Sequence, residues 1–282
     1  MKLVRFGDPG QERPGVVDDQ GRLRDLSDHI EDISPQTLSA PVLASLATLA
    51  IDSLPLVGDQ QVRLGPPVSA VGKIICIGLN YTDHAAEVGL PLPAEPTIFI
   101  KGARPTGAND PVMLPRNAEK GDWEVELGIV IGLGGLYIDE ATALDHVAGF
   151  CVVNDLTERS YQMDRGGQWT KGKSFPGFAP IGPWLVTPDE VPDVGERSIW
   201  LEVNGHRYQN GNTRNLVFGV PQIVSYVSQF YQLEPGDVIA TGTPAGVGLG
   251  QKPPVFLRAG DVVTLGIDGL GNQRQKIVAW HD

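Results

Sequence analysis

The chain has 282 residues and a formal net charge of −12, which argues against binding to nucleic acid or to anionic membrane surfaces. Its hydrophobic content of 41% and mean hydropathy of −0.08 are typical of a globular protein, and no apolar run is long enough for a transmembrane helix. The first residues lack the apolar core of a signal peptide. Cys76 and Cys151 each lie inside an apolar run, which predicts buried thiols in a reducing cytoplasm rather than a disulfide or a zinc site.

Residues 1–70 are predicted to form a small N-terminal α+β domain. Short apolar runs predict strands within residues 2–7, 13–27 and 62–68. A hairpin turn is expected at Asp19-Gln20-Gly21, and residues 34–50 have helix-like spacing that starts from Ser34 as a cap. No constellation of catalytic residue types occurs here, so we assign this unit a structural role.

Residues 71–282 are predicted to form a second, larger domain that is mostly β. Glycine and proline recur between short Val/Ile/Leu runs, which favours many strands and turns over long helices. Strands are predicted at residues 73–81, 97–102, 121–132, 147–156, 198–210, 235–248 and 259–271. Helices are predicted at residues 139–147, 157–169 and 220–233. The fold class is therefore mostly β, within the α+β class.

The predicted strand at 121–132 places three carboxylates, those of Asp122, Glu124 and Glu126, at alternate positions and so on one face. A solvated acidic face is one interpretation, because such strands are common. The apolar residues that follow, Gly128–Ile131, instead indicate a buried strand. In a buried strand like charges are costly unless a cation offsets them. With Asp155 at the end of another apolar strand, the oxygen donors suit Mg²⁺ or Mn²⁺, and Ca²⁺ less well.

A second candidate site lies in "NYTDHAAEVG", where His84 and Glu87 are three residues apart. On a helical turn this spacing places the carboxylate against the imidazole, as in a general base. A solvated loop histidine is an equally good interpretation. The glycine clusters at 132–135 and 246–250 lack the spacing of a dinucleotide-binding motif, and turns explain them better.

The larger domain resembles the fumarylacetoacetate hydrolase family, specifically its bacterial members with a short N-terminal domain. The resemblance runs in order from about residue 73 to residue 271. The matching stretches are "GLNYTDHAAE", "PTIFIKG", "DWEVELGIVIG", "AGFCVVNDLTERSYQ", "GGQWTKGKSF", "GPWLVTPDEV", "VNGHRYQNGNT" and "LEPGDVIATGTPAGVG". The resemblance implies a mixed β-sandwich roll around the active site, in a homodimer.

The resemblance also implies roles for individual residues. Glu124, Glu126 and Asp155 would bind the metal, with Asp122 beside them and not a ligand. His84 and Glu87 would activate water, on a loop that orders over the substrate. Lys173 would steady developing negative charge, and further polar contacts to the substrate would come from Arg159, Gln162 and Thr243. The chain departs from many relatives after "GKS", where Phe175-Pro176-Gly177 follows.

The implied function is a cytoplasmic hydrolase that uses Mg²⁺ or Mn²⁺, and no organic cofactor, to cleave the C–C bond of a small 2,4-diketo acid. The products would be pyruvate and a carboxylic acid. Within the family, residues 166–213 most resemble enzymes that cleave a 2,4-diketo-3-deoxy sugar acid to pyruvate and lactate in sugar catabolism. Decarboxylation of oxaloacetate, and isomerisation or hydration of unsaturated oxo acids, are alternatives within the family. A non-catalytic binding domain with a structural cation is the alternative of another class.

Overall fold

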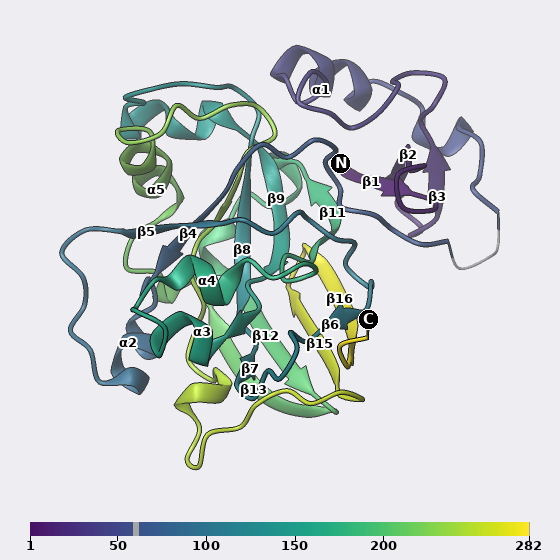
Figure 1. Cartoon of the computed structure of the whole chain (residues 1–282). Helices are drawn as coiled ribbons and strands as arrows, with labels where there is room; N and C mark the ends of the chain where they lie inside the picture. Colours follow the sequence, from purple (N-terminus) through teal and green to yellow (C-terminus); the bar gives the residue numbers. More distant parts are fainter. Residues whose placement is uncertain (59–61, 282) are drawn as a thin grey trace.

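The computed structural model describes residues 1–58 and 62–281. In this part of the chain, one large sheet has nine strands in the order β3-β2-β1-β11-β9-β8-β14-β4-β5 (Figure 1). Its strands are β1 (Lys2–Phe6), β2 (Arg13–Val17), β3 (Leu23–Asp25), β4 (Ile74–Gly78), β5 (Thr97–Lys101), β8 (Val125–Ile131), β9 (Val147–Asn154), β11 (Ile181–Val186) and β14 (Val238–Ala240). Neighbouring strands are antiparallel, except that β14 and β4 are parallel.

A second sheet has five strands in the order β13-β12-β15-β16-β6. Its strands are β6 (Val112–Met113), β12 (Ser198–Val203), β13 (His206–Asn212), β15 (Val262–Ile267) and β16 (Gly271–Val278). Strands β8 and β9 of the large sheet pack against β12, β15 and β16 of the second sheet. Apolar side chains such as Leu127, Val152 and Leu265 are completely buried in the core. The predicted fold class, mostly β within the α+β class, is confirmed.

Short helices cover the sheets and connect their strands. They are α1 (Ala40–Ala47), α2 (Thr82–Val88), α3 (Arg159–Met163), α4 (Trp169–Lys173) and α5 (Val220–Val227), with 3₁₀ turns at Ile51–Ser53, Glu140–His146, Pro188–Glu190, Val194–Glu196, Thr213–Asn215 and Gly248–Gly250. None of the helices in the described residues is long and apolar enough to cross a membrane.

Two predictions in the N-terminal region are wrong. The helix expected from Ser34 begins at Ala40, because Pro41 lacks an amide hydrogen and is accommodated in the first turn. Within residues 62–68 only Leu64 forms an isolated bridge, since Pro66 and Pro67 cannot donate to a ladder. The predicted hairpin turn is present between β2 and β3, where the amide of Gly21 donates to the carbonyl of Asp18.

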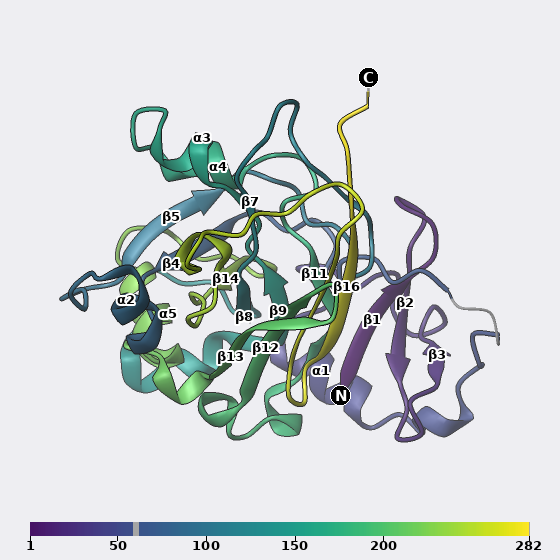
Figure 2. The ribbon, with the colours of Figure 1, turned by 90° about the horizontal axis from the view of Figure 1, so that it is seen from below.

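The N-terminal strands continue the large sheet, because β1 pairs with β11 through Lys2 and Leu3. Figure 2 shows β1, β2 and β3 at one side of the molecule, beside the core built by the rest of the chain. The division into domains at 1–70 and 71–282 stays a prediction.

The acidic stretch was predicted to be one continuous strand, and this prediction is wrong. It begins as β7 (Gly121–Asp122), which pairs with β10 (Thr157–Glu158), and it resumes as β8 at Val125. Asp122 therefore belongs to a different pair of strands from Glu126, and its carboxylate is free to bond elsewhere.

The burial of β8 can be tested with a matched pair of leucines. Leu127 is 0% exposed, whereas Leu133, just after β8, is 55% exposed. Leu127→Ala is expected to lower the free energy of unfolding by about 2–5 kcal/mol. Leu133→Ala should change it by less than about 0.5 kcal/mol. Urea denaturation followed by circular dichroism measures both, and equal losses in the two variants would contradict the assigned core.

Candidate active site

The two central strands of the large sheet bring the three predicted metal ligands together. Strand β8 pairs antiparallel with β9, so that Glu126 lies opposite Val153. The amide of Asp155, just after β9, donates to the carbonyl of Glu124 over 2.9 Å. Each of Glu124, Glu126 and Asp155 then offers a carboxylate oxygen within 4.8 Å of the others. All three side chains are buried.

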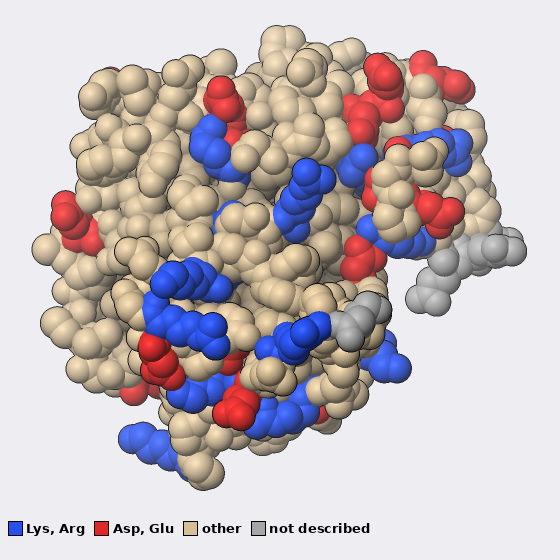
Figure 3. Space-filling view, in the orientation of Figure 1, with Lys and Arg blue, Asp and Glu red and all other residues tan. Residues whose placement is uncertain are grey.

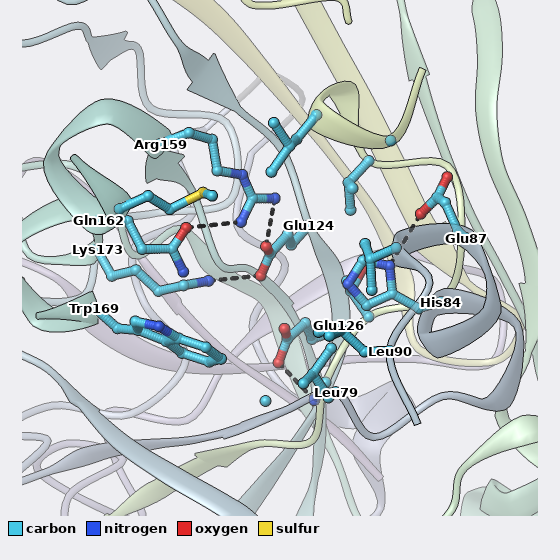
Figure 4. A pocket seen from close by; sticks show the side chains of 18 of the residues that line it. Leu79, His84, Glu87, Leu90, Glu124, Glu126, Arg159, Gln162, Trp169 and Lys173 are labelled. Carbon is cyan, nitrogen blue, oxygen red and sulfur yellow. Dashed lines mark hydrogen bonds and ion pairs between the residues drawn. The ribbon is translucent and has the colours of Figure 1, made fainter. Parts of the chain in front are cut away.

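Three basic side chains surround this cluster. The Lys173 ammonium donates to Glu124 Oε2 over 2.6 Å (Figure 4). It also donates to Asp155 Oδ2. Arg159 Nη2 lies 2.7 Å from Glu124 Oε1. Lys101, at the end of β5, bonds Asp155 Oδ1 over 2.5 Å and the carbonyl of Leu156 over 2.9 Å.

Lys101 was not predicted from the sequence. In "TIFIKG" it ends a short strand that is followed by glycine, a place where a lysine is most often solvated. Its partner lies 54 residues further along the chain, and no local pattern indicates that pairing. The side chain is completely buried, so Lys101 is part of the charge balance of the site.

Glu126 differs from the other two carboxylates. In the described part of the chain it alone of the three has no salt bridge, and its Oε2 accepts a hydrogen bond from the amide of Gly242 over 2.8 Å. Burial and the charges of Asp155 and Glu124 raise the pKa of Glu126 well above its ordinary value. Burial acts in the same direction on Glu124, but the charges of Lys173 and Arg159 outweigh it and lower the pKa of Glu124 to about 2.

This donor set fits a divalent metal ion. Oxygen is the only donor that the three carboxylates offer, which suits hard cations such as Mg²⁺ and Mn²⁺. The uncompensated charge of Glu126 is the physical reason that a cation is favoured there. Glu124, Glu126 and Asp155 are therefore the residues that would hold it.

The His84–Glu87 pair is on α2, in a segment where a polar loop was predicted. His84 Nδ1 and Glu87 Oε2 are 3.0 Å apart, because residues three apart share one face of the helix. The other oxygen of Glu87 accepts a hydrogen bond from the amide of Gly246 over 2.8 Å. Glu87 thus fixes Nδ1 of the imidazole and leaves Nε2 free. The ordering of this segment over a substrate stays a prediction.

A cavity of about 500 Å³ joins the pair to the carboxylate cluster. Eight of the predicted site residues line it: His84, Glu87, Glu124, Glu126, Arg159, Gln162, Lys173 and Thr243. Figure 4 shows His84 on α2 facing the side chains of Arg159, Gln162 and Lys173 on α3 and α4, with Glu124 and Glu126 between them. Asp155 is not among the lining residues, and it is joined to them through Lys173, which donates to both Asp155 and Glu124.

The remaining walls of the cavity are largely apolar. They include the side chains of Leu79, Leu90, Phe99, Met163, Trp169, Val247 and Leu249. Lys252 also lines the cavity and is exposed. Thr243 donates its hydroxyl to the carbonyl of Val125 over 2.8 Å. Phe175 packs edge-on against Phe178, with ring centroids 5.5 Å apart, and is not one of the lining residues.

With this geometry in place, the chain can be compared with known proteins. The family model "Fumarylacetoacetate (FAA) hydrolase C-terminal" matches residues 73–278. The chain belongs to the fumarylacetoacetate hydrolase family, as its sequence stretches predicted. A protein of Burkholderia cenocepacia named "Putative hydrolase" is 57% identical over 277 residues, which are 98% of this chain and 98% of that relative.

Solved structures of enzymes share the fold over nearly the whole chain. A fumarylacetoacetate hydrolase from Exiguobacterium antarcticum is 35% identical, with a TM-score of 0.84 over 99% of this chain and 100% of that one. A maleylpyruvate hydrolase from Sphingobium, solved with manganese(II) and pyruvate, is 29% identical, with a TM-score of 0.83 and 100% of both chains covered. A 2-hydroxyhepta-2,4-diene-1,7-dioate isomerase from Mycobacterium marinum is 31% identical, with a TM-score of 0.75 and the same coverage.

The assignment of Glu126 as a metal ligand predicts effects of opposite sign on stability and on binding. Glu126→Gln should leave the metal-free melting temperature unchanged or higher, because one of three mutually repelling carboxylates is removed. It should also abolish the rise in melting temperature that Mn²⁺ is expected to give the wild type. In the wild type, Mn²⁺ affinity should fall as pH is lowered, because the raised pKa of Glu126 makes a proton compete with the ion.

The matched control is Glu140→Gln, at an exposed glutamate. It should leave the Mn²⁺ titration as in the wild type. A Glu126→Gln variant that binds Mn²⁺ normally would show that Glu126 is not a ligand.

Proposed function

We propose that this protein is a divalent-metal-dependent hydrolase that cleaves the C3–C4 bond of a 2,4-diketo acid. One observation carries the proposal: the His84–Glu87 pair and the buried carboxylates of Glu124 and Glu126 line the same cavity. A base next to a metal centre is the combination that hydrolysis needs, because water must be deprotonated where a carbonyl is polarised. Membership of a family of enzymes supports catalysis over a purely structural cation.

A cation held by Glu124, Glu126 and Asp155 would act as a Lewis acid toward the carboxylate and the C2 oxygen of a 2-oxo acid. His84, through the Nε2 that Glu87 does not engage, takes a proton from water as its oxygen bonds to C4. Glu87 stabilises the imidazolium that results. The C3–C4 bond then breaks, and its electron pair stays on C3.

The leaving fragment is the enolate of pyruvate, which becomes pyruvate when C3 takes up a proton. C4 becomes the carboxyl group of the second product. Lys173 is the cavity-lining ammonium whose charge stabilises the enolate. Its pKa is raised because, although burial lowers it, the charges of Asp155 and Glu124 more than offset the burial. Lys173 therefore stays charged through the reaction.

An anionic substrate is also favoured by the distribution of charge. Figure 3 shows that Lys and Arg side chains gather on the face that carries α3 and α4, although the net charge of the chain is −12. Because α3 and α4 contribute walls of the cavity, these charges raise the local concentration of an oxo acid near its mouth.

The particular substrate that we propose is L-2,4-diketo-3-deoxyrhamnonate, cleaved to pyruvate and L-lactate. It is supported by the resemblance of residues 166–213. The cytoplasmic location and the homodimer are proposals of the same kind. A panel of 2,4-diketo acids, oxaloacetate and an unsaturated 2-oxo acid, assayed with Mg²⁺ or Mn²⁺ for pyruvate, CO₂ and isomer, tests the reaction class. Pyruvate from the diketo acids supports hydrolysis, whereas release of CO₂ or isomer alone contradicts it.

Two variants separate hydrolysis from decarboxylation within one protein. His84→Ala should reduce cleavage of a 2,4-diketo acid by on the order of 10²–10⁴-fold, which is the usual effect of removing a positioned base. It should reduce any decarboxylation of oxaloacetate much less, because loss of CO₂ needs no attacking water. Lys173→Met should reduce both reactions, because both pass through the same enolate.

The control variant is His146→Ala, at a half-buried histidine far along the chain from α2. It should retain both activities. If His84→Ala cleaves the diketo acid normally, His84 is not the base. If it loses both activities equally, His84 serves the shared enolate instead.

A further inference from the structure

The segment Gly246–Gly250, which reads GVGLG, does more than make a turn. A Cβ on Gly246 would lie 2.0 Å from the carbonyl oxygen of Tyr208, and one on Gly248 would lie 2.0 Å from that of Val255. A Cβ on Gly250 would lie 2.4 Å from Cδ of Glu87. Each alternate residue is therefore glycine because a neighbour already occupies the space of its side chain. The segment is held in a close-fitting slot that ends against the His84–Glu87 pair.

Two carboxylates hold the backbone of this segment. Glu87 Oε1 accepts the hydrogen bond from the amide of Gly246 over 2.8 Å. Asp122 accepts two more, at Oδ1 from Gly248 over 2.6 Å and at Oδ2 from Leu249 over 3.0 Å. Asp122 is 0% exposed and does not line the cavity, so it cannot touch a substrate there.

Asp122 also reaches the carboxylate cluster, through Arg159. Its Oδ2 accepts a hydrogen bond from Arg159 Nε over 2.7 Å, and Nη2 of the same guanidinium lies 2.7 Å from Glu124 Oε1. One side chain thus bonds both the arginine that contacts Glu124 and the segment whose Gly246 amide holds Glu87. Arg159 is a planar, rigid group, so fixing one edge of it fixes the other.

We infer that Asp122 is a positioning residue, which sets the place of the His84–Glu87 pair relative to Glu124. The contacts of Asp122 are seen in the structure, and their consequence for catalysis rests on the proposed function. Asp122 does this without contributing an atom to the cavity. Its position in β7, separate from β8, allows the carboxylate to turn toward Gly248 and Arg159 instead of joining the metal ligands.

Two independent variants test the inference. Asp122→Asn presents an amide group to four N–H donors, those of Gly248, Leu249, Arg159 Nε and Trp123. Gly248→Ala adds a methyl group 2.8 Å from Asp122 Oδ1 and 2.0 Å from the carbonyl oxygen of Val255. Each should lower kcat for a 2,4-diketo acid by about 10–100-fold, the usual effect of losing a supporting contact behind a metal site. The dissociation constant of Mn²⁺ should change much less than kcat, because Glu124, Glu126 and Asp155 are retained. The double variant should lose little beyond the worse single variant, because both break one contact.

Hydrogen exchange gives a readout that does not depend on turnover. The amides of Gly248 and Leu249 should exchange faster in Asp122→Asn than in the wild type, because their acceptor is weakened. The controls are Asp164→Asn, in an exposed ion pair with Lys120, and Gly195→Ala, where a Cβ meets nothing within 4 Å. Both controls should retain wild-type kcat and exchange. Asp122→Asn leaves Arg159 with less compensation, and Gly248→Ala crowds the carbonyl of Val255. The kcat of each variant is therefore divided by the native fraction that its near-ultraviolet circular dichroism spectrum gives, so that unfolding does not count as a loss of positioning.

The outcomes separate this inference from the proposed function. Suppose that the amides of 246–250 exchange faster in the variants, but the wild type cleaves no diketo acid. This result would support the contact of Asp122 with the segment and refute the proposed function. Unchanged exchange in both variants would overturn the inference. A loss of Mn²⁺ affinity that matches the loss of kcat would also overturn it, since Asp122 would then act on the ligands rather than on the dyad. The inference would also be overturned if the fold-losses of kcat in the two single variants multiplied in the double variant.

Discussion

Buried carboxylates that share one site repel one another, and most of the contacts around this site offset that repulsion. Four acids lie close together in the interior, Asp122, Glu124, Glu126 and Asp155, and three cations, Lys101, Arg159 and Lys173, make salt bridges with three of them. Desolvation of each charge is offset only where an opposite charge and hydrogen bonds replace water. Glu126 is the acid that is left over, and a bound cation would complete the balance.

The same charge balance explains why the site can be both rigid and reactive. Lys101 and Lys173 each donate to a different oxygen of Asp155, and all three side chains are buried. Two of the groups that line the cavity, the imidazole of His84 and the ammonium of Lys173, then carry the proposed proton transfer and the stabilisation of charge. Charged groups that are already in place need little reorganisation as the reaction proceeds. Much of the electrostatic stabilisation of a transition state comes from such preorganisation.

Much of the site could be predicted from local sequence patterns, because its key pairs are near neighbours along the chain. The alternation of Glu124 and Glu126 and the three-residue spacing of His84 and Glu87 are such patterns, and the structure brings all four to one cavity. The position of Asp155 at the end of an apolar strand indicated the third carboxylate, and the resemblance to a family added Arg159, Gln162, Lys173 and Thr243 as a set. Their places in the structure agree with a shared site, and their roles stay proposals.

What could not be predicted depends on contacts between residues far apart in the sequence. Lys101 looks like a surface lysine until its strand is placed beside Asp155. The glycines at 246–250 look like turn residues until the backbone of Tyr208 and Val255 is seen to fill their side-chain space. The break between β7 and β8 is likewise set by the pairing of Asp122 with Thr157, which no alternation of residue types reveals.

The central claim is that water attacks C4 of a 2,4-diketo acid, and isotope-labelled water tests it most directly. The purified protein would be loaded with Mn²⁺ and incubated with a 2,4-diketo acid in H₂¹⁸O. The masses of the products would then be measured by mass spectrometry. Our account predicts pyruvate together with a carboxylic acid that carries at least one oxygen from the solvent in its new carboxyl group. Metal-dependent turnover that yields an isomer or CO₂, with no such labelled acid, would contradict it.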